Sequence, residues 1–471
     1  MKRRELLNAM PAMATLLAMG ACGRSTDDVA AEPAVSEAVN SGVATPQSPK
    51  GLEGIFPRFT EHVPLVPTYC VTPDLDRCMH RFHLSSPFSP SGRYMGLTRL
   101  PREDRPPKPG EAAEIVLVDL QTGEQKVIAE TIGWDVQLGA QVQWGATDQD
   151  LFFNDVDSTT WMPFGVRMDP LSGQKQKLDG TIYSVSPDGK WAASTCLRRI
   201  GATQAGYGVV VPASGIPVNI GAVDDDGVYV TNTGTGESRM IASYRRIVDE
   251  ALPKIDMSRY GPGNFYGFHV KWNAHSDRLM LVLRYMPESD GKRRPMLLTM
   301  TRDGDDIRVA FPTSEWADKG GNHPNWLPDG EHVMMNLDIH GDGERFVQAR
   351  YDGTDMKVMT DVMSNRGHPS LHPDGRFIIT DAYAAEKAGF GDGTAPLWLI
   401  DREKSKKKTL VRMNSVTPPW ADDPGKAKVM RVDFHPAWDR RTHTRVAFNG
   451  VHDGTRRVYV ADLSDVITNS D

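Results

Sequence analysis

The fold of this chain can be read from one stretch, HPNWLPDGEHVMMNL, at residues 323–337. It joins a short apolar segment, a Pro-Asp-Gly turn and a β-rich run, a pattern typical of two strands around a tight turn. Internal repetition of such a unit indicates one repeat architecture rather than several unrelated domains. Six related stretches occur along the chain: SPFSPSGRYMGL (86–97), AQVQWGATDQDLFF (140–153), IYSVSPDGKWAAS (182–194), HVKWNAHSDRLMLVL (269–283), HPSLHPDGRFIIT (368–380) and HPAWDRRTHTRVAF (435–448).

Each copy is followed by a second phrase in which a strand ends in a polar turn, for example EIVLVDLQTGE after the first copy. Repeats of roughly 40–60 residues with this content predict four-stranded blades. We therefore expect an all-β protein, a seven-bladed β-propeller. The seventh copy ends near residue 465, one strand short, and an extended segment near residues 60–69 is expected to complete it. A helix is expected only in the insertion near residues 244–256.

Composition excludes several classes of protein. The chain has 471 residues and a net charge of −7, which argues against a nucleic-acid binder because such proteins present a basic field. Its 43 Gly and 33 Pro favour turns over long helices. Four cysteines are too few for a disulfide-built scaffold. Cys70 and Cys78 could form one disulfide in an oxidising compartment, which we favour, or remain free thiols.

The N-terminus is expected to be an export signal rather than part of the fold. Residues 1–22 combine a basic start with a modest apolar stretch, and Arg3-Arg4 resembles a twin-arginine signal. Gly20-Ala21-Cys22 resembles a lipobox, so Cys22 is expected to carry a lipid anchor, with an ordinary cleaved signal as the alternative. Residues 23–54 lack a hydrophobic period and predict a flexible tether. The propeller is then expected over residues 55–471, in the periplasm or on the outer membrane.

Aligned copies place one residue of each blade at the central channel. Four consecutive copies carry histidine at this register, although only 13 residues of the chain are histidine. A His-Pro pair can simply open a strand, but four converging imidazoles favour a metal or substrate site. Asp433 lies on the same strand as His435 and could add an oxygen ligand. The aligned positions are Ser85, Gln141, Ile182, His269, His323, His368 and His435.

Other motifs carry less information. The sequence has no GxSxG elbow, HExxH helix or Walker loop, which argues against a peptidase or a nucleotide enzyme. The run from Asp338 to Glu344 resembles a calcium loop without its full spacing, so an acidic hairpin tip is the better interpretation. Four tryptophans share a repeat position and are expected to pack between blades rather than bind sugar: Trp144, Trp272, Trp326 and Trp438.

Copies that read HPxWxPDG, GHPSxHPDGR and HPAW resemble the propeller polysaccharide lyases that include oligogalacturonate, ulvan and rhamnose–glucuronate lyases. The resemblance covers roughly residues 60–465, and residues 81–148 look most like the last two groups. In oligogalacturonate lyases a GHEFW-type copy holds a catalytic histidine, and GNHPNW places His323 there. The resemblance also implies a divalent metal (Ca, Mn or Zn) at His368, His435 and Asp433. The usual HPHP pair is, however, reduced here to Asp433-Phe-His435.

Ulvan and rhamnose–glucuronate lyases carry a tyrosine sixteen residues before an arginine in the third blade, and Tyr183 and Arg199 reproduce this spacing. The resemblance implies an upstream catalytic histidine as well, for which His83 is the nearest candidate. A lyase of this kind removes the C5 proton of a uronate and expels the C4 oxygen. His83 or His323 would be the base and Tyr183 the acid, while Arg199 or a metal would stabilise the enolate. Further substrate contacts are assigned to Tyr207, His269, Gln141 and Arg198.

These expectations lead to a monomeric, exported lyase that cleaves rhamnosyl-α-1,4-glucuronic acid linkages of an anionic polysaccharide. An oligogalacturonate-type lyase is the first alternative. A non-catalytic periplasmic propeller and a hydrolase of the same bond are the others, although no paired carboxylates support the hydrolase. The acidic net charge requires a locally basic groove. Its candidate residues are Arg198, Arg199, Arg245 and Arg246.

Overall fold

The structure is a computed structural model that describes residues 51–416 and 428–468. The chain divides into two compact units, residues 1–48 and 49–471, and every described residue belongs to the second. The predicted signal with Cys22, and most of the predicted tether, lie outside the described residues. Leu52, near the end of that tether, is buried in an apolar cluster. None of the helices in the described part is long and apolar enough to cross a membrane.

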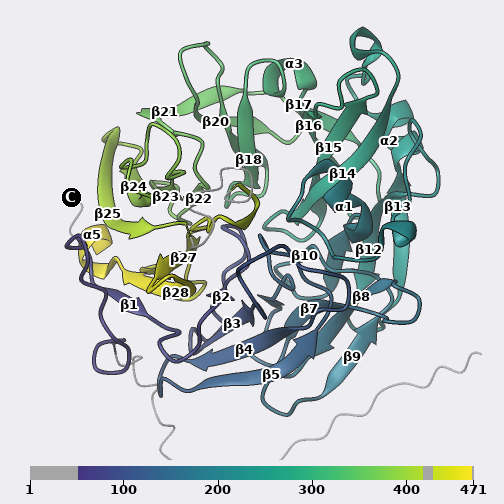
Figure 1. Cartoon of the computed structure of the whole chain (residues 1–471). Coiled ribbons are helices and arrows are strands. Elements are labelled where there is room, and N and C mark those ends of the chain that lie inside the picture. The colour runs from purple at the N-terminus through teal and green to yellow at the C-terminus, as the bar shows by residue number, and fades with distance from the viewer. Residues whose placement is uncertain (1–50, 417–427, 469–471) are drawn as a thin grey trace, which may run out of the picture. The chain divides into compact units, whose positions relative to one another are not determined.

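The described residues form antiparallel sheets, which confirms the all-β prediction, and Figure 1 shows the sheets following one another in chain order around a common centre. Five sheets have four strands each. They contain β2 (Cys78–Met79), β3 (Tyr94–Arg99), β4 (Ala113–Asp119) and β5 (Gln125–Thr131); β6 (Gln143–Trp144), β7 (Leu151–Val156), β8 (Pro163–Met168) and β9 (Lys175–Leu178); β10 (Ser184–Val185), β11 (Trp191–Ser194), β12 (Gly227–Asn232) and β13 (Ser238–Ser243); β14 (Gly263–Trp272), β15 (Arg278–Pro287), β16 (Arg294–Thr301) and β17 (Arg308–Phe311); and β18 (Gly321–Trp326), β19 (His332–Leu337), β20 (Arg345–Arg350) and β21 (Lys357–Met363).

The sixth sheet has eight strands and joins the two ends of the described chain. A single residue pair, Asn414 with Val451, links its two halves. In the second half β1 pairs with β28, so a segment from the N-terminal side supplies the last strand, at the end of the stretch expected to do so. The strands are β22 (Ser370–Leu371), β23 (Phe377–Asp381), β24 (Thr394–Asp401) and β25 (Lys406–Asn414), then β26 (Ala437–Trp438), β27 (Arg445–His452), β28 (Thr455–Asp462) and β1 (Thr68–Cys70).

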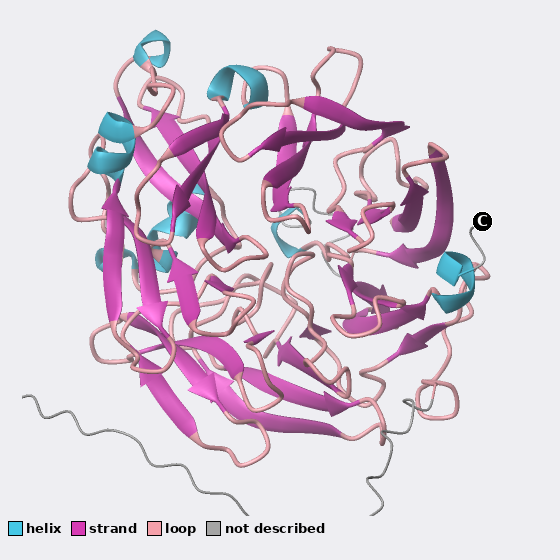
Figure 2. Ribbon diagram, turned by 180° about the vertical axis from the view of Figure 1, so that it is seen from behind, coloured by secondary structure: helices cyan, strands magenta, loops and turns pink. Residues whose placement is uncertain are grey.

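Helices are short and lie between or beside the sheets; from behind, in Figure 2, strands run around the centre and loops cross it. The helix expected near residues 244–256 is α2, which begins where Ser243 accepts a hydrogen bond from the backbone N–H of Arg246. Helix α1 was not predicted from the sequence. The short helices are α1 (Leu197–Thr203), α2 (Tyr244–Glu250), α3 (Thr313–Trp316) and α5 (Ser464–Thr468), with 3₁₀ turns η1 (Ala213–Gly215) and η2 (Ser258–Tyr260).

The repeated tryptophans fasten each sheet to the one before it. Each indole N–H donates to a backbone carbonyl on the innermost segment of the preceding repeat, at 2.8–3.1 Å. A buried indole needs such a partner because an unpaired donor is expensive away from water. The structure therefore confirms that these tryptophans pack between repeats, as expected. The donors are Trp144, Trp272, Trp326 and Trp438.

Backbone irregularities aim side chains at the centre. Pairing in β18 skips from Asn322 to Asn325, and between them His323 has φ of 53°. The equivalent Gln141 and His435 also have left-handed backbone, with φ of 62° and 50°. A bulge of this kind redirects a side chain out of the regular alternation of a strand. Because these equivalent positions share the irregularity, their side chains gather at the centre of the sheets.

The first repeat differs because its inner strand is interrupted. Residues 80–87 leave the sheet after β2, and the chain returns only at the isolated pair Phe88–Met95. Asn449 of β27 holds the start of this segment, accepting from the backbone N–H of residue 80 at 2.8 Å and donating to its carbonyl at 3.2 Å. The segment thereby places the Phe82 side chain among the innermost strands.

The favoured disulfide between Cys70 and Cys78 is wrong, because both residues are buried free thiols. Cys70 of β1 packs with Phe59 and Tyr459, whereas Cys78 of β2 belongs to a different apolar cluster. Burial raises the pKa of both thiols, so each behaves as a small apolar side chain.

Candidate functional site

The histidines at the aligned register meet around one phenylalanine. The ring of Phe82, only 1% exposed, lies 4.3–6.0 Å, between centroids, from the rings of His83, His269, His368 and His435. His323 lies against His368 at 3.9 Å. These five histidines are called the histidine cluster below. Figure 1 shows two strands close to the centre of the sheets: β18, which carries His323, and β22, which follows His368.

Hydrogen bonds fix which nitrogen of these rings carries the proton. Nδ1 of His83, His323 and His435 lies 2.8, 2.8 and 3.1 Å from a backbone carbonyl oxygen. Because a carbonyl only accepts, each Nδ1 must donate, and Nε2 of the neutral ring keeps a free lone pair. Nε2 of His323 lies 3.4 Å from the Tyr383 hydroxyl. Among the described residues, Nε2 of His83 and His435 is buried without a partner.

Asp381, the last residue of β23, orients His368. Its two carboxylate oxygens lie 2.9 and 3.0 Å from Nδ1, and one also accepts the backbone N–H of His368 at 2.7 Å. A carboxylate on Nδ1 fixes the ring and makes Nε2 a better ligand, as is usual for histidines that hold metals. Within the described chain, Nε2 of His368 is also buried without a hydrogen-bond partner.

The chemistry of one side-chain set fits a divalent metal ion. Nε2 of His368 and Nε2 of His435 each lie 3.9 Å from Oδ2 of Asp433, and all three side chains are buried. Two bare imidazole nitrogens facing one carboxylate would be costly to bury unless they shared a cation. Imidazole and carboxylate together suit first-row divalent metals. Arg431 also holds Asp433, through two contacts at 2.7 and 2.8 Å.

A tyrosine–histidine pair includes His269, whose ring lies 5.2 Å from that of Phe82. The hydroxyl of Tyr183 and Nδ1 of His269 share a buried hydrogen bond at 2.8 Å. Tyr207 lies next to this pair, with its ring 6.4 Å from that of His269. Burial raises the pKa of Tyr207 to about 12, and that of Tyr183 further, so both phenols stay protonated at neutral pH.

Three buried cations line the same region. Arg81 donates to Gln141 at 2.6 Å and its guanidinium lies 4.8 Å from the Tyr183 ring centre, while Lys271 Nζ is 5.3 Å from that of Phe82. Arg284 lies 3.3 Å from the ring centre of Phe268, beside His269, and donates to Thr203 and Gln204. Within the described ranges no carboxylate pairs with any of the three. Burial lowers the pKa of each one: Arg81, Lys271 and Arg284.

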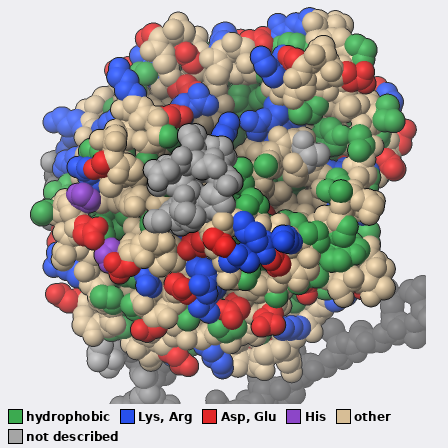
Figure 3. Space-filling view, viewed as in Figure 1, with side chains coloured by type: hydrophobic (Ala, Val, Ile, Leu, Met, Phe, Trp, Pro, Cys, Tyr) green, Lys and Arg blue, Asp and Glu red, His purple; other side chains and the backbone are tan. Residues whose placement is uncertain are grey.

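Three of the four basic residues expected to line a groove are bonded to other groups of the protein. Arg199 is paired with the buried Asp226 at 2.7 Å rather than with Tyr183. Arg198 donates to the carbonyl of Gly215 at 2.7 Å, and Arg246 pairs with Glu250 and Asp305. Arg245 is exposed on α2, and Figure 3 shows basic and acidic side chains interspersed over one face of the molecule. The candidates were Arg198, Arg199, Arg245 and Arg246.

One residue missed from the sequence had a usable signal. The second strand of several repeats carries Asn or Asp in its second half, and this residue bonds the backbone of the adjoining repeat. In one repeat the residue is a carboxylate, Asp381, which can also reach an imidazole. Arg81, Lys271, Arg284 and Tyr383 carried no such repeated pattern. The residues that share the position are Asn154, Asn336, Asp381 and Asn449.

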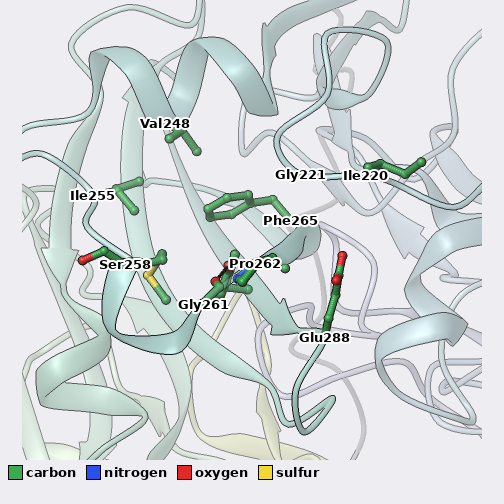
Figure 4. Close-up of a pocket in the computed structure, with 12 residues that line it drawn as sticks. Ile220, Gly221, Val248, Ile255, Ser258, Gly261, Pro262, Phe265 and Glu288 are labelled. Atoms are coloured by element: carbon green, nitrogen blue, oxygen red, sulfur yellow. Dashed lines mark hydrogen bonds between the residues drawn. The ribbon is translucent and has the colours of Figure 1, made fainter.

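One cavity lies apart from the histidine cluster. It measures about 470 Å³ and is bordered by α2, the start of β14 and the end of β15 (Figure 4). Its walls are mostly apolar, with Val248, Ile255 and Phe265 facing the space and Glu288 at one side. Such a cavity offers little acid–base chemistry, so the histidine cluster is the candidate active site.

We expect folding stability to fall as pH drops below about 6.5. Burial, with repulsion from Lys271 or from neighbouring histidines, lowers the pKa of four of the cluster histidines well below the usual 6.5. The unfolded chain therefore binds protons in this window that the folded chain does not, and stability rises with pH through it. The four histidines are His83, His269, His323 and His435.

Denaturant melts at pH 5, 6 and 7 in the presence of a chelator would measure this effect. A midpoint that stays constant or rises toward pH 5 would contradict the neutral cluster. His332→Gln, a change at a histidine outside the cluster, is the matched control.

Comparison with solved structures supports a propeller-type fold. The chain is similar to an oligogalacturonate lyase in complex with manganese, with 14% identity and a TM-score of 0.60, over 88% of this chain and 97% of that one. It is also similar to the oligogalacturonate lyase of Vibrio parahaemolyticus, with 13% identity, a TM-score of 0.59 and coverage of 87% and 97%. No family model matches the sequence, and no curated protein matches it either.

Proposed function

We propose that this protein is a metal-assisted lyase that cleaves oligosaccharides of uronic acids by β-elimination, with oligogalacturonate as the first candidate substrate. The observation that carries the proposal is the set His368, Asp433 and His435, two bare imidazole nitrogens facing one carboxylate. A fold likeness to an oligogalacturonate lyase in complex with manganese supports it, and suggests Mn²⁺ as the ion.

A uronate lyase must first neutralise the substrate carboxylate, because the C5 proton is acidic only when the enolate is stabilised. The buried cations Arg81, Lys271 and Arg284 lack carboxylate partners in the described residues and can supply this charge. A divalent ion held by the three-residue set would add Lewis-acid stabilisation of the same carboxylate. The sequence analysis assigns this part to Arg199 or a metal.

His323 is the proposed base. Its Nε2 has a free lone pair and its ring is less buried than that of His83. It would take the C5 proton while the C4–C5 double bond forms and the C4–O bond breaks. Tyr383, 3.4 Å from Nε2, has a pKa raised well above 10 by burial and can return a proton to the leaving oxygen.

The proposal includes seven blades and an exported protein. Five four-stranded sheets, with an eight-stranded sheet whose halves meet at one residue pair, support the blade count. Export as a periplasmic or outer-membrane lipoprotein rests on residues 1–22 alone. An anchored monomer acting on soluble oligosaccharides is the simplest arrangement.

A second candidate function is cleavage of rhamnosyl–glucuronate linkages in ulvan-type polysaccharide. One specific observation favours it, the buried Tyr183–His269 pair beside Tyr207, because a lyase of that type is expected to use a tyrosine acid. Arg199, the other half of the predicted motif, is engaged with Asp226.

The test is incubation of the protein and Mn²⁺ with oligogalacturonate, ulvan and gum arabic, following the ultraviolet absorbance of an unsaturated uronate. We expect absorbance with oligogalacturonate and its loss when a chelator removes the metal. Absorbance with ulvan alone would favour the second candidate. New reducing ends without absorbance would mean hydrolysis, and no product from any substrate would overturn the lyase proposal.

A further inference from the structure

One pair of strands, β14 and β15, extends further than the corresponding pair of the next sheet. β14 begins at Gly263, six residues before its register histidine, His269, whereas β18 begins two residues before His323. The first residues of β14 pair with the last residues of β15, after which the chain turns into β16. The turn between β15 and β16, residues 288–293, therefore lies at this extended end.

Two arginines at the extended end share one neutral acceptor. Arg284 of β15 donates to Oε1 of Gln204 at 2.8 Å, and Arg293 of the turn donates to the same oxygen. Gln204 directly follows helix α1, which lies beside β14 (Figure 1). Two guanidinium groups repel each other, and a single amide oxygen does not neutralise them. Arg284 and Arg293, called the arginine pair below, are therefore arranged to accept an anion.

Among the described residues no carboxylate balances the arginine pair. The nearby Asp290 is already paired with Arg294, at 2.6 Å. Burial, and then repulsion by Arg293, lowers the pKa of Arg284, and no carboxylate of the described chain opposes this shift. Arg293 is exposed, so a ligand can reach it from solvent. The group that this charge selects is an oxyanion, whose oxygens accept from guanidinium N–H groups.

Tyr207 connects the arginine pair with the candidate site. Its ring centroid lies 5.2 Å from that of Phe268 and 6.4 Å from that of His269, and the guanidinium of Arg284 lies 3.3 Å from the ring centre of Phe268. Burial raises the pKa of Tyr207 to about 12, and the charges of Asp433 and Arg284 also act on it, in opposite directions. The same phenol is therefore within reach of a residue of the proposed metal set and of the arginine pair.

We propose that Arg293, held beside Arg284 by Gln204, binds the carboxylate of the uronate next to the one at which the substrate is cleaved. Arg284 is the more buried of the two and keeps its proposed part at the cleaved uronate. The inference rests on the proposed function for the identity of the substrate, although binding does not require cleavage. It implies a preference for acidic sugars in neighbouring positions, which oligogalacturonate supplies. A sulfate ester on the neighbouring sugar has the same oxyanion chemistry, and the experiment separates the two sources.

Titration calorimetry on the full chain with Mn²⁺ tests this, in a His323→Gln background that should bind substrate without cleaving it. The probes are D-galacturonate, digalacturonate, and a rhamnosyl–glucuronate disaccharide with and without sulfate on the rhamnose. We expect Arg293→Gln to lower the affinity for digalacturonate about tenfold, as for loss of a hydrogen bond to a charged group, and to leave that for D-galacturonate unchanged. Lys292→Gln removes an equal charge from the adjacent exposed residue and is the matched control, with both affinities unchanged.

The outcomes separate this subsite from the proposed function. If digalacturonate binding depends on Arg293 but the parent protein cleaves no uronate polymer, the subsite stands and the proposed function fails. If the parent cleaves oligogalacturonate but Arg293→Gln leaves digalacturonate affinity unchanged, the subsite is overturned and the function stands. An equal loss of affinity in Lys292→Gln would also overturn the subsite, since the effect would then be one of net charge. A loss confined to the sulfated disaccharide would overturn the carboxylate assignment and identify the anion as a sulfate.

Discussion

Replacing His368 by alanine is expected to lower kcat/KM for uronate cleavage by about 10³-fold or more, because it removes one of three side chains that fit the metal and with it several kcal/mol of charge stabilisation. Its Nε2 is buried without a hydrogen-bond partner in the described residues and so is free to bind an ion. Steady-state kinetics with added Mn²⁺, together with the metal content of the purified variant, would measure the effect.

A graded series makes this prediction specific. Asp381→Asn keeps the size of the side chain but weakens its hold on Nδ1, so a loss of about 10–100-fold in metal affinity or activity is expected. His372→Ala is the matched control: this histidine lies four residues further on and bonds the carbonyl of His443. A His368→Ala enzyme that retains both full activity and bound metal would refute the metal site.

The repeat and the histidine register could be predicted from sequence because both are local. A turn follows each inner strand, and counting back seven residues from the turn glycine or three from the tryptophan aligns His323 with His368 and His435. Left-handed backbone at His323 and His435 then aims these side chains at the centre. The four repeated tryptophans were predictable for the same reason, since each occupies one register and meets the same kind of partner.

The partners of the histidines could not be predicted because ring closure brings them from other repeats. Asp381 ends a second strand, and Arg284 lies on β15, one sheet before the strand that carries His323. Burial alone distinguishes Arg284 from the exposed Arg245, and burial depends on the packing of whole sheets. The segment with Phe82 is a further case, because leaving its sheet places it among four histidine rings.

The ion pair of Arg199 could not be predicted for a related reason. The sixteen residues from Tyr183 to Arg199 span β10, β11 and the start of α1, whereas its charge partner, Asp226, lies beyond the next loop, just before β12. Short helix α1 carries Arg199 to that carboxylate. The spacing motif therefore identified Tyr183, which lies at the candidate site. It could not show that Arg199 is already paired with a carboxylate.

Arg199→Ala is expected to act on stability and Arg284→Ala on catalysis. Arg199 and Asp226 are 9% and 1% exposed, so removing the guanidinium strands a buried carboxylate and should lower the free energy of unfolding by about 3–5 kcal/mol. Arg284 already lacks a carboxylate partner in the described residues, so its loss relieves an unpaired charge while lowering kcat/KM about 10²-fold.

Denaturant unfolding and kinetics at low temperature separate the two effects. The double variant Arg199→Met with Asp226→Leu removes both charges together and should recover most of the lost stability, because a buried ion pair contributes little beyond matching apolar groups. Folded Arg199→Ala should keep kcat/KM within a few-fold of the parent. A large loss of kcat/KM in a stable Arg199→Ala protein would contradict this prediction and favour the ulvan-type function. In that case the Arg199 guanidinium would have to leave Asp226 and bind the substrate carboxylate.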